Sequence, residues 1–120
     1  MAQILTVDDS ITMRQMVKFT LTSAGHEVEE ASNVDEALET VRGRRFDLVI
    51  ADVNMPGKNG IELVKALRAM SAFKFTPILM LTTESEPALK RAGKAAGATG
   101  WIVKPFDPDT LLSVLQRVLG

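Results

Sequence analysis

The sequence contains no cysteine. This absence excludes disulfide bonds, thiolate zinc sites and cysteine nucleophiles, and it is consistent with a reducing compartment. No apolar run approaches the roughly 20 residues that a membrane-spanning helix needs. The polar start Met1-Ala2-Gln3 does not resemble a signal peptide. We therefore expect a cytoplasmic protein that has no membrane segment.

The chain also lacks an excess of charge of either sign. Its 14 lysines and arginines stand against 15 aspartates and glutamates, which leaves a net charge of −1. A molecule with this balance has no overall attraction to nucleic acid or to a membrane, so we expect no direct contact with either. Internal repeats, low-complexity tracts and linker-like stretches are missing too. We expect one compact domain over residues 1–120.

Short apolar runs alternate with helix-length amphipathic segments five times along the chain. The apolar runs lie at residues 4–7, 27–29, 48–51, 77–81 and 101–103. The third and fourth runs are apolar without interruption, which is typical of central strands covered on both faces, whereas the polar second run indicates an edge strand. The pattern predicts an α/β fold, with five helices around a doubly wound, flavodoxin-like parallel sheet of order 2-1-3-4-5.

Chemically active side chains follow four of the five predicted strands. Asp8 and Asp9 follow the first strand, Asp52 the third, Thr82 the fourth and Lys104 the fifth. Ligands of open parallel sheets bind beyond the carboxyl ends of the strands, where these side chains would meet. Each residue alone has an ordinary explanation, such as a helix cap for Asp9 or a turn for Asp52. Such explanations do not account for all four strand ends together.

The chemistry of this set indicates phosphoryl transfer. Three converging carboxylates repel one another, and a hard cation such as Mg²⁺, which prefers carboxylate and water ligands, relieves that repulsion. Lys104 adds positive charge, and the Thr82 hydroxyl can donate a hydrogen bond. A cation, an ammonium group and a hydroxyl around a carboxylate can stabilise a phosphoryl group in transfer. Asp52 is the best candidate nucleophile because it follows the central strand.

Four motifs with these residues are similar to those of the receiver domains of two-component response regulators, over essentially the whole chain. In kind, the sequence resembles single-domain chemotaxis regulators. The motifs are Val7-Asp8-Asp9-Ser10, Asp52-Val53-Asn54-Met55-Pro56-Gly57-Lys58-Asn59-Gly60, Leu81-Thr82-Thr83 and Gly97-Ala98-Thr99-Gly100-Trp101-Ile102-Val103-Lys104-Pro105-Phe106.

The resemblance implies that Asp52 accepts a phosphoryl group from a histidine kinase or a small phosphodonor. The protein would then catalyse only its own phosphorylation and slow dephosphorylation, and would not be an enzyme in the usual sense. Asp9 and Asp52 would hold Mg²⁺, together with Asp8 through water and the backbone carbonyl of Asn54. Lys104 would pair with the phosphoryl group.

The resemblance also implies residues that switch or tune the signal. Thr82 would swing toward the phosphoryl group, while Asn54 and Glu84 would tune the access of water to it. Trp101 stands where the family usually has a tyrosine or phenylalanine that turns inward on activation. Because tryptophan is larger, a full inward rotation would need movement of the neighbouring helix. The alternative, given the same weight, is that Trp101 is an ordinary half-exposed aromatic residue of an edge strand.

The expected partners are the kinase and a downstream target protein, which would bind the face of the fourth helix, fifth strand and fifth helix. The fourth helix has Leu89 as its only large apolar side chain, so it buries little and can shift at low cost. Lys90, Arg91 and Lys94 form either a solvated face or a site for an acidic peptide of the target once Asp52 is phosphorylated. We expect a monomer, with dimerisation on phosphorylation left open.

Other functions remain open at this point. The chain could be a receiver domain excised from a DNA-binding transcriptional regulator, a question that the length of the gene would answer. An aspartate-based phosphatase would need a second carboxylate two residues after the nucleophile, where this chain has Asn54. In a flavin-binding protein, Asp8, Asp9 and Asp52 would repel the flavin phosphate unless a cation intervened.

Overall fold

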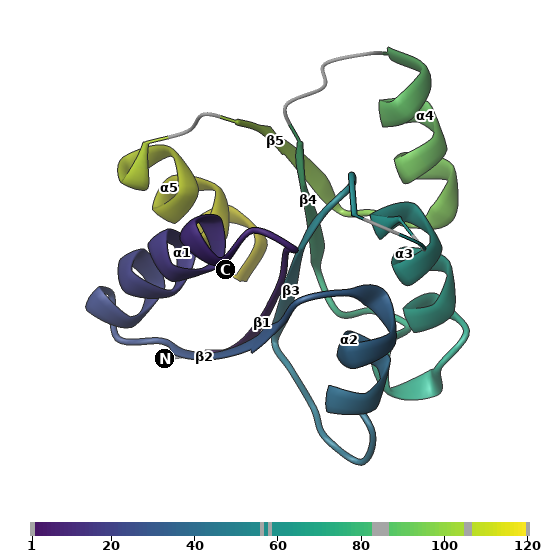
Figure 1. Ribbon diagram of the computed structural model, residues 1–120, viewed down its shortest axis with the longest axis horizontal. Coiled ribbons are helices and arrows are strands. Elements are labelled where there is room, and N and C mark those ends of the chain that lie inside the picture. The colour runs from purple at the N-terminus through teal and green to yellow at the C-terminus, as the bar shows by residue number, and fades with distance from the viewer. Residues whose placement is uncertain (1, 56, 58, 83–86, 105–106, 120) are drawn as a thin grey trace.

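The computed structural model describes residues 2–55, 57, 59–82, 87–104 and 107–119. Strands and helices alternate along the chain (Figure 1). The elements are β1 (Gln3–Val7), α1 (Ile11–Ser23), β2 (Glu27–Ala31), α2 (Val34–Thr40), β3 (Leu48–Asp52), α3 (Gly60–Arg68), a 3₁₀ turn η1 (Ser71–Phe73), β4 (Ile78–Thr82), α4 (Pro87–Ala96), β5 (Gly100–Val103) and α5 (Pro108–Leu119).

The five strands form a parallel sheet in the order β2-β1-β3-β4-β5. The predicted fold class is therefore confirmed, together with the assignment of the polar second strand and the short fifth strand to the edges. β3 and β4 are buried at every residue, as their uninterrupted apolar sequences predict. The carboxyl ends of all five strands lie along the same edge of the sheet, because the strands are parallel.

Helices cover both faces of the sheet (Figure 1). A layer of buried hydrophobic side chains lies between the sheet and the helices on each face. Alternate residues of each strand point to opposite faces, so neighbours such as Ile50 and Ala51 belong to different layers. Val17 and Leu21 of α1 pack with Leu111 and Leu115 of α5 on one face. Helices α2, α3 and α4 cover the other face, with Ala37, Leu63, Val64, Leu67 and Leu89 in that layer.

Polar side chains cap helices α1, α2, α3 and α5 at their first turn; at α2, Asn33 Oδ1 accepts from the Glu36 N–H at 2.7 Å. The Ser10 hydroxyl accepts from the Met13 N–H at 3.2 Å, so Ser10, not Asp9, is the cap of α1. The Asn59 side chain and Glu62 form a reciprocal capping box at the start of α3. Asp107, immediately before α5, accepts from the Thr110 N–H at 2.7 Å. The helix cap considered for Asp9 is thus wrong, and its carboxylate is left for another role.

Among the helices of the described residues, none is both long and apolar enough to cross a membrane. Their lengths run from 7 residues in α2 to 13 in α1.

Candidate functional site

Three aspartates gather at the carboxyl edge of the sheet. Asp8 and Asp9 follow β1, and Asp52 is the last residue of the adjacent strand β3. One carboxylate oxygen from each lies within 4.8 Å of the others. Asp8 and Asp52 are buried, with 2% and 6% of their surface exposed, whereas Asp9 is exposed. The structure therefore brings together the three acidic residues that the sequence singles out, and leaves the cluster open to solvent on the Asp9 side.

Lys104 is the cation of this cluster. Its Nζ lies 3.1 Å from Oδ2 of Asp8 and 3.4 Å from Oδ1 of Asp52, so one ammonium group bridges the two buried carboxylates. Its backbone N–H donates to the carbonyl of Thr82 at 2.7 Å, which ties the residue after β5 to the end of β4. One lysine offsets only part of the charge of three carboxylates, and the cluster as a whole remains acidic.

Burial raises the pKa of the Asp52 carboxyl above its ordinary value. Lys104 acts in the opposite direction through its charge and hydrogen bond, Asp8 raises the pKa further, and the Asn54 backbone N–H lowers it by donating to the carboxylate. The ionised form of Asp52 thus depends on cationic neighbours. Removing Lys104 or adding a bound cation would shift this balance in opposite directions.

The backbone around Asp8 is held by residues that the sequence analysis did not single out. The Ser10 N–H donates to Asp8 Oδ1 at 2.9 Å, which orients this carboxylate toward Lys104. Arg14 of α1 donates from Nη1 to the Asp8 carbonyl at 2.6 Å, and its Nε lies 3.5 Å from Glu30 of β2. Arg14 therefore positions the loop between β1 and α1. The only sequence signal for this role is an arginine one turn after the helix start.

Gly60, also missed, allows α3 to start directly beside Asp52. A Cβ on Gly60 would collide with the backbone carbonyl of Asp52 and would lie 2.9 Å from Cε of Met80. The Gly60 N–H donates to the Val53 carbonyl at 3.0 Å, so this close approach is held by a hydrogen bond. Glycine is needed here for space alone, because its φ is not positive.

Two further predicted residues lie at the same edge. Thr82, fully buried, ends β4 next to Asp52 of β3, and Asn54 is exposed two residues beyond Asp52. Glu84, to which the resemblance assigns a role in tuning water access, lies outside the described residues. The roles assigned to Thr82 and Asn54 in switching and tuning stay predictions.

The donor set fits a hard divalent cation. All three nearest ligand groups are carboxylates, Mg²⁺ favours one or two carboxylates plus water, and the exposed Asp9 gives access from solvent. Two of the carboxylate oxygens already have partners, since Asp8 accepts from Ser10 and Lys104. Asp52 likewise has partners, since Lys104 Nζ lies 3.4 Å from its Oδ1 and the Asn54 N–H donates to its carboxylate, so which carboxylates ligate a cation directly stays a prediction.

Trp101 packs beneath α4 at the edge of the sheet. It is half-buried, and its indole Nε1 is buried with no hydrogen-bond partner among the described residues. Gly93, the only buried residue of α4, lies against the ring: a Cβ there would sit 2.6 Å from Cζ3 of Trp101. Trp101 is thus a half-exposed edge-strand aromatic in this structure. Its rotation on activation stays a prediction.

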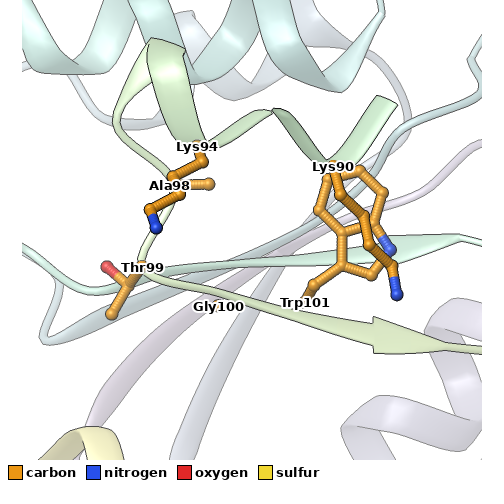
Figure 2. A pocket seen from close by; sticks show the side chains of 6 residues that line it. All are labelled: Lys90, Lys94, Ala98, Thr99, Gly100 and Trp101. Carbon is orange, nitrogen blue, oxygen red and sulfur yellow. The ribbon is translucent and has the colours of Figure 1, made fainter. Parts of the chain in front are cut away.

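A hollow of about 290 Å³ opens between α4 and β5. Figure 2 shows Lys90 and Trp101 at one end of it and Lys94, Ala98 and Thr99 at the other. On α5, Leu112 and Val114 are both half-buried. The face predicted to bind a target therefore carries a hollow with two lysines and an aromatic ring.

Comparisons with known proteins agree with this fold. The family model of the response regulator receiver domain matches residues 4–116. The chain is 44% identical to the chemotaxis protein CheY1 of Helicobacter pylori over 120 residues, which cover 98% of this chain and 97% of that protein. It is 43% identical to a chemotaxis protein CheY homolog of Campylobacter jejuni, covering 98% of this chain and 92% of that protein.

The solved structures include a near relative of the same kind. The chemotaxis protein CheY4 of Vibrio cholerae matches with a TM-score of 0.95 and 61% sequence identity, covering 98% of each chain. Family model, curated relatives and structural match all point to the same family over nearly the full length. The chain belongs to the family of response regulator receiver domains and is similar to CheY chemotaxis proteins.

Proposed function

We propose that this chain is a phosphorylation-dependent switch of a two-component system and that Asp52 accepts the phosphoryl group. The observation that carries the proposal is the convergence of Asp8, Asp9 and Asp52 with Lys104 at one edge of the sheet. As a CheY-like response regulator, the chain is a signalling protein and not a conventional enzyme.

Asp52 would act as the nucleophile. One oxygen of its carboxylate attacks the phosphorus of a phosphohistidine or of a small phosphodonor. The new O–P bond forms while the bond to the donor breaks, and the departing group keeps the electron pair. The attack needs the ionised carboxylate, which Lys104 and the Asn54 N–H favour against the effect of burial. Asp52 would be restored when water hydrolyses the acyl phosphate.

Mg²⁺ is the metal that the acidic pocket of this family takes, and the carboxylates here fit it. Asp9 and Asp52 would hold the ion directly, with Asp8 through water and with the backbone carbonyl of Asn54. When bound, Mg²⁺ supplies positive charge for the phosphoryl oxygens. Lys104, which now bridges Asp8 and Asp52, is within reach of a group attached to Asp52 and would neutralise part of its charge.

The signal would leave the pocket through β4 and β5. Thr82 and Lys104 lie at the ends of these strands and are joined by a backbone hydrogen bond. A displacement of one residue would therefore displace the other. Helix α4 follows β4 and buries only Gly93, which makes it the helix that is easiest to displace. A target protein would bind the face of α4, β5 and α5, with Lys90 and Lys94 as candidate contacts for acidic side chains.

The proposal is tested by intact-mass measurement after incubation with Mg²⁺ and acetyl phosphate or phosphoramidate. We expect a gain of one phosphoryl group that requires Mg²⁺ and is lost in Asp52→Asn. The matched control is Asp47→Asn, an exposed aspartate at the other end of β3, which should be phosphorylated like the unmodified protein. Unaltered mass with both donors, or an equal gain in Asp52→Asn, would contradict the proposal.

A further inference from the structure

A groove lies at the edge of the sheet opposite to the carboxylate cluster. Two surface hollows, of about 430 and 470 Å³, share Arg45, Ser71 and Ala72 in their walls and are therefore continuous. Residues 41–47, between α2 and β3, form one wall, and residues 70–73 and 75–77, between α3 and β4, form the other. No part of the proposed phosphorylation chemistry uses these residues.

Positive charge is concentrated along this groove, although the whole chain has a net charge of −1. Arg42, Arg44 and Arg45 are exposed on one wall, and Lys74, which does not itself line either hollow, is exposed beside Phe75 of the other. Arg42 and Arg44 pair with Glu39 and Glu29 at 3.7 and 3.6 Å, but exposed pairs of this kind contribute little. Arg45 has no ion pair or hydrogen bond to any residue that the structure describes, although it lines both hollows.

An exposed aromatic ring lies among these cations. Phe75 is 87% exposed, the highest value among the large hydrophobic residues that the structure describes, and it lines the smaller hollow. The Lys74 ammonium lies 5.6 Å from the centroid of its ring, and the Arg44 guanidinium lies 4.9 Å from the Phe46 ring in the same groove. A cationic wall beside an exposed phenylalanine offers both a charge contact and an apolar contact to a ligand.

We propose that this groove binds a short acidic peptide segment of a partner protein, with Arg45 and Lys74 contacting its carboxylates and Phe75 an apolar side chain. The surroundings favour a short peptide over nucleic acid. Glu29 and Glu39 border the arginines, and Asp47, whose Oδ2 accepts from the Gln3 N–H at 2.7 Å, lines the smaller hollow, so a long polyanion that extends past Arg45 meets negative charge. A segment of a few acidic residues stays within the basic part.

The groove is separate from the phosphorylation site. Asp47 directly precedes β3 and Asp52 ends it, so the two residues are about 16 Å apart at the usual rise per residue. A peptide in the groove leaves the carboxylate cluster and the α4–β5 hollow free. The protein can therefore hold a second partner whatever the phosphorylation state of Asp52.

The test uses fluorescence anisotropy with a fluorescein-labelled octaglutamate peptide as the probe and the unphosphorylated protein. We expect saturable binding that weakens as salt is raised. The affinity for the probe should fall about fivefold or more in Arg45→Glu. Octaglutamate has no apolar side chain, so Phe75→Ser should bind it like the unmodified protein. A second labelled probe with a leucine among its glutamates should bind more tightly than octaglutamate, and Phe75→Ser should remove that gain without changing the charge. The matched control is Arg117→Glu on α5, which alters the net charge as Arg45→Glu does but should leave binding unchanged. Circular dichroism of each variant establishes that it is folded.

Several outcomes would overturn this inference. One is that the probe shows no saturable binding. Another is that Arg45→Glu and Arg117→Glu lower the affinity for the probe equally. A third is that Lys94→Glu lowers this affinity and Arg45→Glu does not, which would place the probe on α4. Tighter binding of a labelled octathymidylate through Arg45 would make the groove a nucleic-acid site. Because Asp52→Asn should bind the probe like the unmodified protein, failure here is distinguishable from failure of the phosphorylation proposal.

Discussion

The packing of Trp101 on Gly93 gives a sharp prediction about the switching face. In Gly93→Ala, the new Cβ would lie 2.6 Å from Cζ3 and 3.4 Å from Cε3 of Trp101, whereas carbon atoms in contact prefer about 3.5–4.0 Å. Either the indole or α4 must move by about 1 Å. Overpacking of this kind costs about 1–3 kcal/mol, and alanine in place of glycine within a helix returns about 1 kcal/mol. We expect Gly93→Ala to change the free energy of unfolding by between about 0 and −2 kcal/mol.

A double-mutant cycle with Trp101→Phe separates the two effects. Phenylalanine lacks the benzo ring that carries Cζ3, so the collision is absent and Gly93→Ala should stabilise the Trp101→Phe protein by about 1 kcal/mol. The coupling between the two positions should therefore equal the overpacking cost of about 1–3 kcal/mol. The measurement is urea unfolding followed by far-ultraviolet circular dichroism, which needs no tryptophan signal.

The fluorescence of Trp101, the only tryptophan, reports the displacement directly. In Gly93→Ala its emission should shift to longer wavelength, because the indole is pushed toward solvent. If Gly93→Ala stabilises the protein equally in both backgrounds and leaves the emission unchanged, then Trp101 does not pack on Gly93, and the description of this face is wrong.

Three further predictions concern stability. Arg68 of α3 donates to the carbonyls of Phe73, Thr76 and Gly97 at 2.7–3.0 Å and so joins the segment before β4 to the turn before β5. Arg68→Ala should therefore lower the free energy of unfolding, measured in urea, by at least about 2 kcal/mol. The control is Arg91→Ala at an exposed arginine, which should lower it by less than about 0.5 kcal/mol. Without Mg²⁺, Asp52→Asn should stabilise the protein at pH 7. The folded-state pKa of Asp52 is raised, so its ionised form destabilises the fold above that pKa. The stabilisation by Asp52→Asn should therefore shrink as the pH falls toward the ordinary pKa of aspartate. A stabilisation that grows toward acidic pH would contradict the raised pKa. Mg²⁺ at ten times its Kd should raise the free energy of unfolding by about 1.4 kcal/mol in thermal denaturation, and Asp9→Asn should lose most of that gain, whereas an unchanged gain would exclude Asp9 as a ligand.

The fold could be predicted well from the sequence because its signals are local. The uninterrupted apolar residues of β3 and the alternating charges of β2 reveal how many faces of each strand are covered, and this fixes which strands are central. The apolar pattern does not define the exact ends of the helices. The first helix begins at Ile11 because Ser10 caps it, a choice between adjacent polar residues that the apolar pattern does not resolve.

The residues of the site could be predicted for a related reason. In a parallel sheet, topology alone brings the residue after each strand to a common edge, so Asp8, Asp52 and Lys104 are found without knowing any side-chain contact. Gly60 and Arg14 were missed because their roles depend on contacts between distant parts of the backbone. The same holds for Gly93, whose importance appears only once the direction of the Trp101 ring is known.

The most direct test of the central claim is to find which residue carries the phosphoryl group. After incubation with Mg²⁺ and phosphoramidate, borohydride reduction converts an aspartyl phosphate to homoserine, and tandem mass spectrometry of the peptides then identifies the position. We predict homoserine at Asp52 alone, and none when Mg²⁺ is removed with a chelator. Homoserine at Asp8 or Asp9, or none in the presence of Mg²⁺, would contradict the assignment of Asp52 as the phosphoryl acceptor.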